Sequence, residues 1–179
     1  MLAGRMGAVD NIYLVGLMGA GKTTVGKMLA KQTGKIFYDS DHEIKRRTLV
    51  SISHIFEVEG ESGFRARESA VLEDLTRLKN VVLATGGGAI ISKENRGLLK
   101  EHGTVIYLRA SVGDLWARTR HDKNRPLLQT EDPHARLAEL FAVRDPLYRE
   151  VADIIVDTSK QSVGSLVSHI LQLIGKRKP

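Results

Sequence analysis

One eight-residue stretch constrains the fold of this chain more than any other feature. Residues 16–23 read GLMGAGKT and match the pattern G-x-x-x-x-G-K-[ST]. In this pattern a glycine-rich turn directs backbone N–H groups toward phosphate oxygens, and the lysine adds a positive charge. The apolar run IYLV at residues 12–15 is expected to form a buried strand before the turn, and a helical pattern begins at Lys22. A strand, a phosphate-binding turn and a helix in this order predict a nucleotide-binding α/β protein.

The rest of the chain alternates between short apolar runs and amphipathic segments. Further strands are expected at residues 36–38, 81–84, 104–108 and 154–156. Helices are expected over residues 22–33, from Ser40, and over about 61–78, 92–101, 111–119, 134–149 and 163–174. Ser40 is expected to cap its helix, because Ser40 and Glu43 fit a capping box. Apolar strands separated by helices predict a five-stranded parallel sheet in a three-layer α/β/α fold of P-loop NTPase type.

The whole chain, residues 1–179, is expected to form one domain, because its length suits a single hydrophobic core. Residues 1–10 show no hydrophobic period and are expected to be a loose lead-in. Residues 175–179 are expected to form a solvated basic tail. Residues 120–133 (RHDKNRPLLQTEDP) are polar and contain two prolines, so a mobile lid loop is expected there.

Composition excludes several classes of protein. The 27 Lys and Arg residues exceed the 21 Asp and Glu residues, which gives a net charge of +6, but aromatic residues make up only 5% and no RNA-binding aromatic motif is present. Nucleic acid is therefore a disfavoured partner. The chain has no cysteine, which excludes disulfides and thiolate chemistry. No signal peptide or membrane span is apparent, and no apolar stripe is left over, so a cytoplasmic monomer is expected.

Two carboxylates follow the second expected strand, in the run Asp39-Ser40-Asp41. Because neighbouring parallel strands end at the same crevice, both carboxylates are expected to face Thr23. One can hold the water shell of Mg²⁺, and the other can orient or deprotonate an acceptor hydroxyl. The alternative is structural, since acidic residues in a first helical turn also favour the helix dipole. No Asn-Lys-x-Asp run is present, which disfavours a GTP-dependent switch.

Several residues suggest an anionic acceptor. Glu68 falls on an apolar helix stripe, where a carboxylate needs a partner, and Arg65 precedes it by three residues. The run Gly86-Gly87-Gly88 follows a strand and lets a ligand approach the backbone, although a plain flexible turn also fits. Arg144 continues a buried helix face, where it needs an anionic ligand or an internal ion pair. Arg125 lies in the lid loop and can swing over a bound phosphate.

Together these motifs resemble those of the shikimate kinases. The resemblance extends from about residue 11 to residue 174 and depends on the order of GLMGAGKTT, FYDSD, GFR with Glu68, TGGG, RPLL and RDPLY. It implies a nucleoside monophosphate kinase-like fold and transfer of the ATP γ-phosphoryl group to the 3-hydroxyl of shikimate, with Mg²⁺, on the route to chorismate and aromatic amino acids. No departure from the family's pattern is found at these positions.

The resemblance also implies a role for each site residue. ATP would be bound by Gly19, Ala20, Gly21, Lys22, Thr23, Thr24, Arg118 and Arg125. Shikimate would be bound by Asp41, Arg65, Glu68, Gly86, Gly87, Gly88 and Arg144. Asp41 would be the base, with Lys22 and Arg125 assisting catalysis. Thr23 and, through water, Asp39 would hold one Mg²⁺.

Other functions stay open from the sequence alone. Another small P-loop kinase, such as a gluconate kinase, also acts on a hydroxy acid. A nucleoside monophosphate acceptor is less favoured, because no base-reading pocket is apparent. A protein that binds ATP or nucleic acid without catalysis is the remaining alternative.

Overall fold

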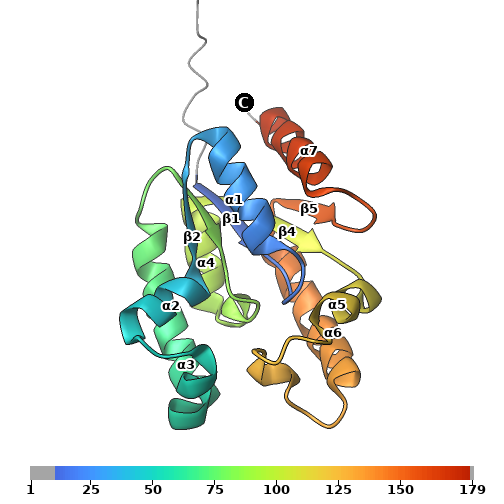
Figure 1. Ribbon diagram of the computed structural model, residues 1–179. Coiled ribbons are helices and arrows are strands. Elements are labelled where there is room, and N and C mark those ends of the chain that lie inside the picture. The colour runs from blue at the N-terminus through green and yellow to red at the C-terminus, as the bar shows by residue number, and fades with distance from the viewer. Residues whose placement is uncertain (1–10, 178–179) are drawn as a thin grey trace, which may run out of the picture.

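The structure is a computed structural model that describes residues 11–177. Its centre is a five-stranded, entirely parallel sheet with the order β2-β3-β1-β4-β5 (Figure 1). The strands are β1 Asn11–Val15, β2 Ile36–Asp39, β3 Val81–Ala84, β4 Gly103–Arg109 and β5 Ile154–Asp157. Each strand expected from the sequence is present in this sheet.

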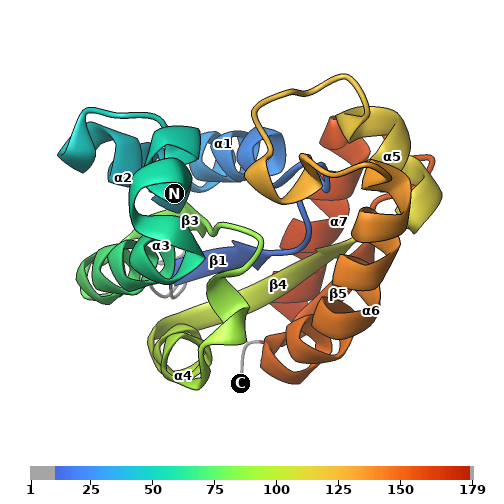
Figure 2. The ribbon, with the colours of Figure 1, turned by 90° about the horizontal axis from the view of Figure 1, so that it is seen from below.

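Helices cover both faces of the sheet. They are α1 Lys22–Thr33, α2 Ser40–Thr48, α3 Ile52–Thr76, α4 Lys93–His102, α5 Val112–Thr119, α6 Pro133–Val151 and α7 Val163–Lys176, with 3-10 turns at Ala89–Ile91 and Pro126–Leu128. Helices α1 and α7 pack together on one face, and α4 and α6 pack on the other (Figure 2). The predicted three-layer α/β/α fold is therefore confirmed.

The central strands are apolar because helices cover both of their faces. Every residue of β1 is buried, and so are Val105, Ile106, Tyr107 and Leu108 of β4. Burying a large apolar side chain of this kind stabilises the folded state by about 1.5–3 kcal/mol. The edge strand β5 alternates between buried and exposed residues instead. The core thus fixes the central strand β1, from which the phosphate-binding turn departs.

The start of α2 differs from the prediction. Ser40 is not the cap; the Asp39 side chain caps the helix by accepting hydrogen bonds from the backbone N–H groups of Asp41 at 3.0 Å and His42 at 3.1 Å. The Ser40 hydroxyl instead accepts a hydrogen bond from the backbone N–H of Gly86 at 2.8 Å. The capping-box prediction was wrong because Ser40 is already helical and is used to join α2 to the turn after β3.

The long helix α3 begins at Ile52 instead of at about residue 61, and ends at Thr76. Gly60 interrupts it with a φ of 71° and a ψ of −177°, a backbone conformation that favours glycine. The predicted start therefore corresponds to the segment after this kink. The helical turns before the kink were not predicted.

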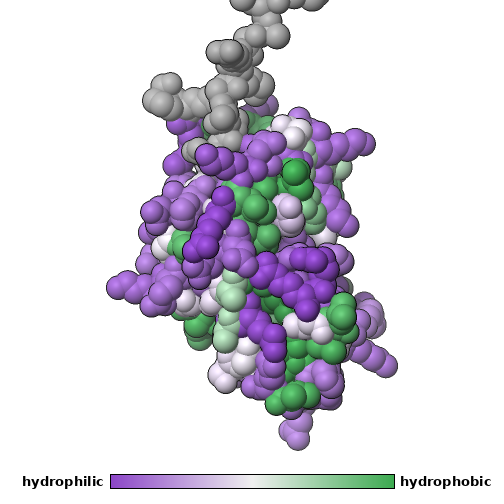
Figure 3. Space-filling model, turned by 90° about the vertical axis from the view of Figure 1, so that its left-hand side faces the viewer, coloured by the Kyte–Doolittle hydropathy of each residue, from purple (hydrophilic) through white to green (hydrophobic). Residues whose placement is uncertain are grey.

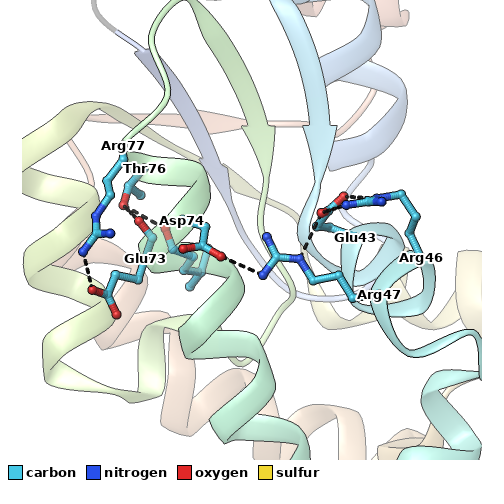
Figure 4. Close-up of polar contacts among 8 residues, drawn as sticks. Glu43, Arg46, Arg47, Glu73, Asp74, Thr76 and Arg77 are labelled. Atoms are coloured by element: carbon cyan, nitrogen blue, oxygen red, sulfur yellow. Dashed lines mark hydrogen bonds and ion pairs between the residues drawn. The ribbon is translucent and has the colours of Figure 1, made fainter.

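An ion-pair chain joins α2 to α3 (Figure 4). Arg47 binds Glu43 at 3.0 Å on its own helix and Asp74 at 2.7 Å on α3. Glu43 also binds Arg46, and these hydrogen bonds lower the pKa of Glu43 to about 2. These ion pairs connect α2, which carries Asp41, to α3, which carries the predicted acceptor-binding residues Arg65 and Glu68.

The described C-terminal residues do not form a loose tail. Helix α7 continues to Lys176, and Arg177 donates a hydrogen bond to the Asp153 carbonyl at 2.8 Å and pairs with the Asp153 carboxylate at 3.2 Å. The predicted lead-in at residues 1–10 and residues 178–179 lie outside the described residues. Between residues 11 and 177, no helix has the length and apolar character needed to cross a membrane.

Candidate active site

The sheet register brings three loops together at one edge. Leu14 of β1 pairs with Ala84 of β3, and Ala84 pairs with Asp39 of β2. The three strands therefore end at the same level. The phosphate-binding turn, the glycine turn after β3 and the first turn of α2 meet there, as expected for the carboxyl edge of a parallel sheet.

The turn before α1 has the geometry of a phosphate-binding loop. Gly19 and Gly21 have φ values of 83° and 94°, and α1 begins directly afterwards. The Lys22 ammonium donates to the backbone carbonyls of Gly16 at 2.6 Å and Leu17 at 2.9 Å. Burial lowers the pKa of Lys22 to about 8, with Asp41 opposing that effect. A buried ammonium that binds only neutral carbonyls gains further stabilisation from an anion.

Arg118 binds the phosphate-binding turn through its guanidinium. Its guanidinium donates to the Gly19 carbonyl at 3.0 Å, and it is not among the residues that line the two cavities described below. Ala20 is buried at 2% exposure, whereas Thr24 lines the larger cavity. The structure thus places Arg118 beside the loop and Thr24 in the cavity next to Thr23.

Beside this turn lie the side chains of Thr23, Asp39 and Asp41, which all carry oxygen atoms. The Thr23 hydroxyl donates to Asp39 Oδ2 at 2.8 Å. Asp41 Oδ1 is buried and has no hydrogen-bond partner among the described residues. Burial, reinforced by the Asp39 charge, raises the pKa of the Asp41 carboxyl. A carboxylate of raised pKa in a polar cleft is suited to accept a proton.

Two adjoining cavities surround these residues. One, of about 850 Å³, is lined by the phosphate-binding turn and the ends of β2 and β3. The other, of about 470 Å³, is lined by α3, the glycine turn and the segment after α5. Residues that line both cavities are Met18, Asp41, Lys45, Gly86, Gly87 and Arg125. Groups bound in the two cavities would therefore meet beside the Asp41 carboxylate.

The smaller cavity contains an arrangement of buried charges. Arg65 Nη1 binds Glu68 Oε1 at 2.8 Å, and Glu68 is only 1% exposed. Burial raises the pKa of Glu68, and the Arg65 charge opposes the rise. Arg144 is 2% exposed, and its Nη1 has no hydrogen-bond partner within the described part of the chain. The predicted pair and the predicted core-facing arginine thus lie around one cavity.

The glycine turn leaves room for these groups. A Cβ at Gly86 would lie 2.6 Å from Glu68 Oε2 and 2.8 Å from Asp41 Oδ1, so any side chain there would displace these carboxylates. A Cβ at Gly88 would overlap the Arg65 guanidinium. Gly86 and Gly88 therefore present bare backbone to these charged groups.

The segment predicted as a lid contributes lining residues to the smaller cavity. Residues 120–132 run from α5 toward α3, with one 3-10 turn at Pro126–Leu128 that was not predicted (Figure 2). Arg125 pairs with Asp122 at 2.9 Å and lines both cavities. Its position allows the guanidinium to approach a phosphate from either cavity.

Sequence reasoning missed two polar contributors to the site. Tyr148 donates a hydrogen bond to the Gly87 carbonyl, and Ser40 accepts one from the Gly86 N–H. Tyr148 lies one helical turn after Arg144, so the shared helix face was a usable signal. Ser40 carried no comparable signal, because a serine at a helix start is usually a cap.

Comparison with known proteins decides the family. A family model described as shikimate kinase matches residues 18–175. The chain belongs to the shikimate kinase family. The shikimate kinase of Nitrosospira multiformis is 62% identical over 170 residues, which cover 95% of this chain and 87% of the relative. That of Chromobacterium violaceum is 62% identical over 161 residues, covering 90% of this chain and 88% of the relative.

Solved structures agree with this placement. A shikimate kinase from Acinetobacter baumannii in complex with shikimate has a TM-score of 0.93 and 55% identity, with 95% of both chains covered. A gluconokinase from Sinorhizobium meliloti has a TM-score of 0.60 at 18% identity, covering 93% of this chain and 92% of the other, and shows the shared fold alone. As a member of the shikimate kinase family, the chain is an ATP-binding phosphotransferase that acts on an alcohol group.

Proposed function

We propose that this chain transfers the γ-phosphoryl group of ATP to the 3-hydroxyl of shikimate and releases shikimate 3-phosphate and ADP, on the route to chorismate and aromatic amino acids. The observation that carries the proposal is the junction of two cavities at Asp41 and Arg125. A base at such a junction touches the acceptor hydroxyl, and a mobile guanidinium reaches the transferring phosphoryl group.

The smaller cavity suits shikimate. Arg144 is buried with Nη1 unpartnered, and an arginine in that state requires an anion such as the shikimate carboxylate. Arg65 supplies the second guanidinium, which Glu68 orients through the 2.8 Å pair. Asp41 and the glycine backbone at residues 86–88 remain for the hydroxyl groups. A small acceptor with one carboxylate and several hydroxyls matches this set.

The larger cavity suits the ATP phosphates. The backbone N–H groups of residues 19–24 and the Lys22 ammonium would bind the β- and γ-phosphates. Arg118 would lie along the adenine, and Arg125 would reach the phosphates from the lid. Lys22 gains most from this contact, because a bound phosphate replaces the backbone carbonyls of Gly16 and Leu17 as its partner.

A magnesium ion fits the oxygen ligands present. The Thr23 hydroxyl oxygen and Asp39 Oδ2 lie 2.8 Å apart, and both are hard oxygen ligands of the type that Mg²⁺ prefers. No group of three His, Asp or Glu side chains gathers for chelation between residues 11 and 177. This favours an ion held by Thr23, by Asp39 through water, and by the nucleotide. When bound, Mg²⁺ would neutralise charge on the phosphates.

The reaction then needs little covalent chemistry from the protein. Asp41 accepts the proton of the acceptor hydroxyl while that oxygen forms a bond to the γ-phosphorus. The bond between the γ-phosphorus and the bridging β-γ oxygen breaks, and ADP leaves with that electron pair. Lys22 and Arg125 stabilise the negative charge on the phosphoryl and leaving-group oxygens.

An acceptor panel tests the proposal. The purified chain is incubated with ATP, Mg²⁺ and, separately, shikimate, gluconate or a nucleoside monophosphate. ADP release and the mass of the phosphorylated product are measured. Turnover is expected with shikimate alone, with a product heavier than shikimate by one phosphoryl group. Turnover with gluconate and not with shikimate would favour the competing gluconate kinase function.

The same proposal includes a monomer acting in the cytoplasm, where ATP is supplied. The large exposed apolar residues are spread over several elements, with examples at Ile36, Val58, Val143 and Ile155. On the face shown in Figure 3, hydrophobic surface is interrupted by polar side chains. Obligate dimers bury larger apolar areas than such separate residues offer. Light scattering coupled to size-exclusion chromatography is expected to give the mass of one chain.

A further inference from the structure

A buried tyrosine next to the smaller cavity has no part in the reaction described above. Tyr148 of α6 is 0% exposed, and its hydroxyl donates a hydrogen bond to the backbone carbonyl of Gly87. Gly87 is the middle residue of the glycine turn that lines both cavities. A side chain of one helix thus holds the backbone wall of the acceptor cavity.

The same hydroxyl lies beside Arg144. Tyr148 follows Arg144 by one helical turn, so the two side chains share a helix face. Burial raises the pKa of the Tyr148 hydroxyl, and the nearby Arg144 charge opposes the rise. A Cβ at Gly87 would be 3.5 Å from Arg144 Nη1. The hydroxyl, the glycine turn and the guanidinium therefore form one compact group.

Packing fixes the position of this tyrosine. Its ring contacts that of Tyr107 on β4, with centroids 4.8 Å apart and planes inclined by 32°. The Tyr107 hydroxyl donates to Asp145 Oδ1 at 2.7 Å, and Arg149 binds Asp145 Oδ2 at 2.9 Å. Tyr107 thus binds α6 to the sheet through Asp145, whereas the Tyr148 hydroxyl binds the glycine turn. Packing against Tyr107 therefore fixes the position of the Tyr148 ring and its hydroxyl.

We propose that Tyr148 is a positioning residue that fixes the Gly86–Gly88 turn relative to the Arg144 guanidinium and so sets the affinity for the acceptor carboxylate. The proposal rests on the proposed function for the identity of the acceptor. Without the hydroxyl, the Gly87 carbonyl would lose its hydrogen bond from Tyr148, and the turn would gain freedom to move away from Arg144. Asp41 is held by helix α2 and Lys22 by helix α1, so neither backbone depends on the Tyr148 hydrogen bond for its position.

Two matched variants test this inference. Tyr148→Phe and Tyr107→Phe each remove one buried, hydrogen-bonded hydroxyl from the same ring pair, so similar losses of stability are expected. Tyr148→Phe is expected to raise the KM for shikimate about tenfold, because the turn and the Arg144 guanidinium are no longer held together to receive the carboxylate, and to leave kcat and the KM for ATP within about twofold. Tyr107→Phe is expected to leave all three constants within about twofold. Equal values of the shikimate KM in the two variants would overturn the proposal.

A measurement without substrate separates this inference from the proposed function. Amide ¹H–¹⁵N spectra of the ligand-free variants are compared with wild type. The Gly86, Gly87 and Gly88 resonances are expected to shift in Tyr148→Phe and to stay in place in Tyr107→Phe. If wild type fails to phosphorylate shikimate, the proposed function fails, and these shifts still decide the positioning role. Unchanged glycine resonances in Tyr148→Phe would contradict it.

A further measurement covers the case in which Tyr148→Phe does not fold. Wild-type protein labelled with 3-fluorotyrosine gives a ¹⁹F signal for Tyr148, with the Tyr107 signal assigned from Tyr107→Phe. Added shikimate, which contacts the glycine turn, is expected to shift the Tyr148 signal and not the Tyr107 signal. A Tyr148 signal that does not respond to saturating shikimate would count against the proposal.

Discussion

At the scale of single residues, the site consists of buried polar atoms that the folded chain leaves without partners. Asp41 Oδ1, Glu68 Oε2 and Arg144 Nη1 all lack a hydrogen-bond partner among the described residues. An unsatisfied buried group costs about 1–3 kcal/mol. Substrate groups that supplied the missing partners would recover this cost, so the fold gives up stability at the place proposed to bind the acceptor.

Replacing the proposed base tests the assignment directly. Asp41→Asn keeps the shape of the side chain but cannot accept the hydroxyl proton. A fall in kcat of about 10²–10⁴ is expected, with the affinity for ATP nearly unchanged. Steady-state kinetics and ATP titration measure both quantities. Glu73→Gln, which loses only an exposed ion pair with Arg77 at the end of α3, is the control and should retain kcat; near-normal kcat in Asp41→Asn would remove Asp41 from the reaction.

Lys22 gives a pH-dependent prediction. Its pKa is lowered to about 8 by burial, so in the ligand-free protein it loses its proton as the pH rises through that value. A bound phosphate favours the charged form and raises the pKa, so nucleotide binding takes up protons. Uptake of about 0.1 proton at pH 7, about 0.5 at pH 8 and about 0.9 at pH 9 is expected.

Calorimetry of ADP binding in buffers of different ionisation enthalpy measures this uptake. Lys22→Arg is the matched control, because a guanidinium stays charged throughout this range and should show no rise. The same pKa predicts that the ligand-free fold gains stability as the pH rises from about 8 to 10.5, where the unfolded chain binds more protons. Uptake that does not increase with pH would contradict the shifted pKa.

Several site residues could be predicted because their chemistry conflicted with their surroundings. Glu68 and Arg144 are charged residues on otherwise buried helix faces, and Asp39 and Asp41 stand at a strand end. Tyr148 shows no such conflict, because a tyrosine suits a core. The helix face that it shares with Arg144 places it near the site, but its hydrogen bond to Gly87, 61 residues away, leaves no local pattern.

At the scale of elements, hydrophobic periodicity predicted the strands and most helices, but not how the chain bends between them. The alternation of apolar strands and helices was sufficient for the parallel sheet. The kink at Gly60 was not predictable, since a single glycine in a helical pattern also occurs in straight helices. The helix cap was misplaced by one residue because Asp39 and Ser40 are both good caps.

The residue that ends α2 has a strained backbone conformation, which a single substitution can relieve. Leu49 has a φ of 60° and is 88% exposed, so it adopts a left-handed conformation without burying its side chain. Leu49→Gly is expected to stabilise the protein by about 0.5–1 kcal/mol, because the relief of the Cβ contact exceeds the added freedom of the unfolded chain. Urea unfolding measures the change. Leu49→Ala keeps the Cβ and is expected to gain nothing; an equal gain from Ala would assign the effect to the side chain instead.

At the scale of the whole molecule, the two cavities adjoin each other, and one irregular segment contributes Arg125 to the lining of both. Residues 120–132 carry Arg125 over the junction, and most of the segment lacks regular structure. The sequence predicted this loop from its polar composition. Whether the segment closes over ligands, as proposed, depends on contacts to Arg125 that no local sequence pattern encodes.

Proteolysis tests lid closure. Trypsin is expected to cut the ligand-free chain after Arg120 and Lys123, and a non-hydrolysable ATP analogue with shikimate is expected to slow these cuts about tenfold. Mass spectrometry of the fragments follows each site. Cleavage after Lys160, in the loop before α7, is the internal control and should keep its rate. Equal protection at both places would point to general stabilisation and not to lid closure.

The ion pairs of Figure 4 link the helix that carries the proposed base to a helix that carries proposed acceptor-binding residues. Arg47 fastens α2, which carries Asp41, to α3, which carries Arg65 and Glu68. Arg144, on α6, lines the same cavity from a third helix. In the proposed complex, a carboxylate bound by both guanidiniums would join α6 to the pair of helices that includes α2, and α2 carries the proposed base. An acceptor that lacks the carboxylate would then lose this coupling between its own binding and the placement of Asp41.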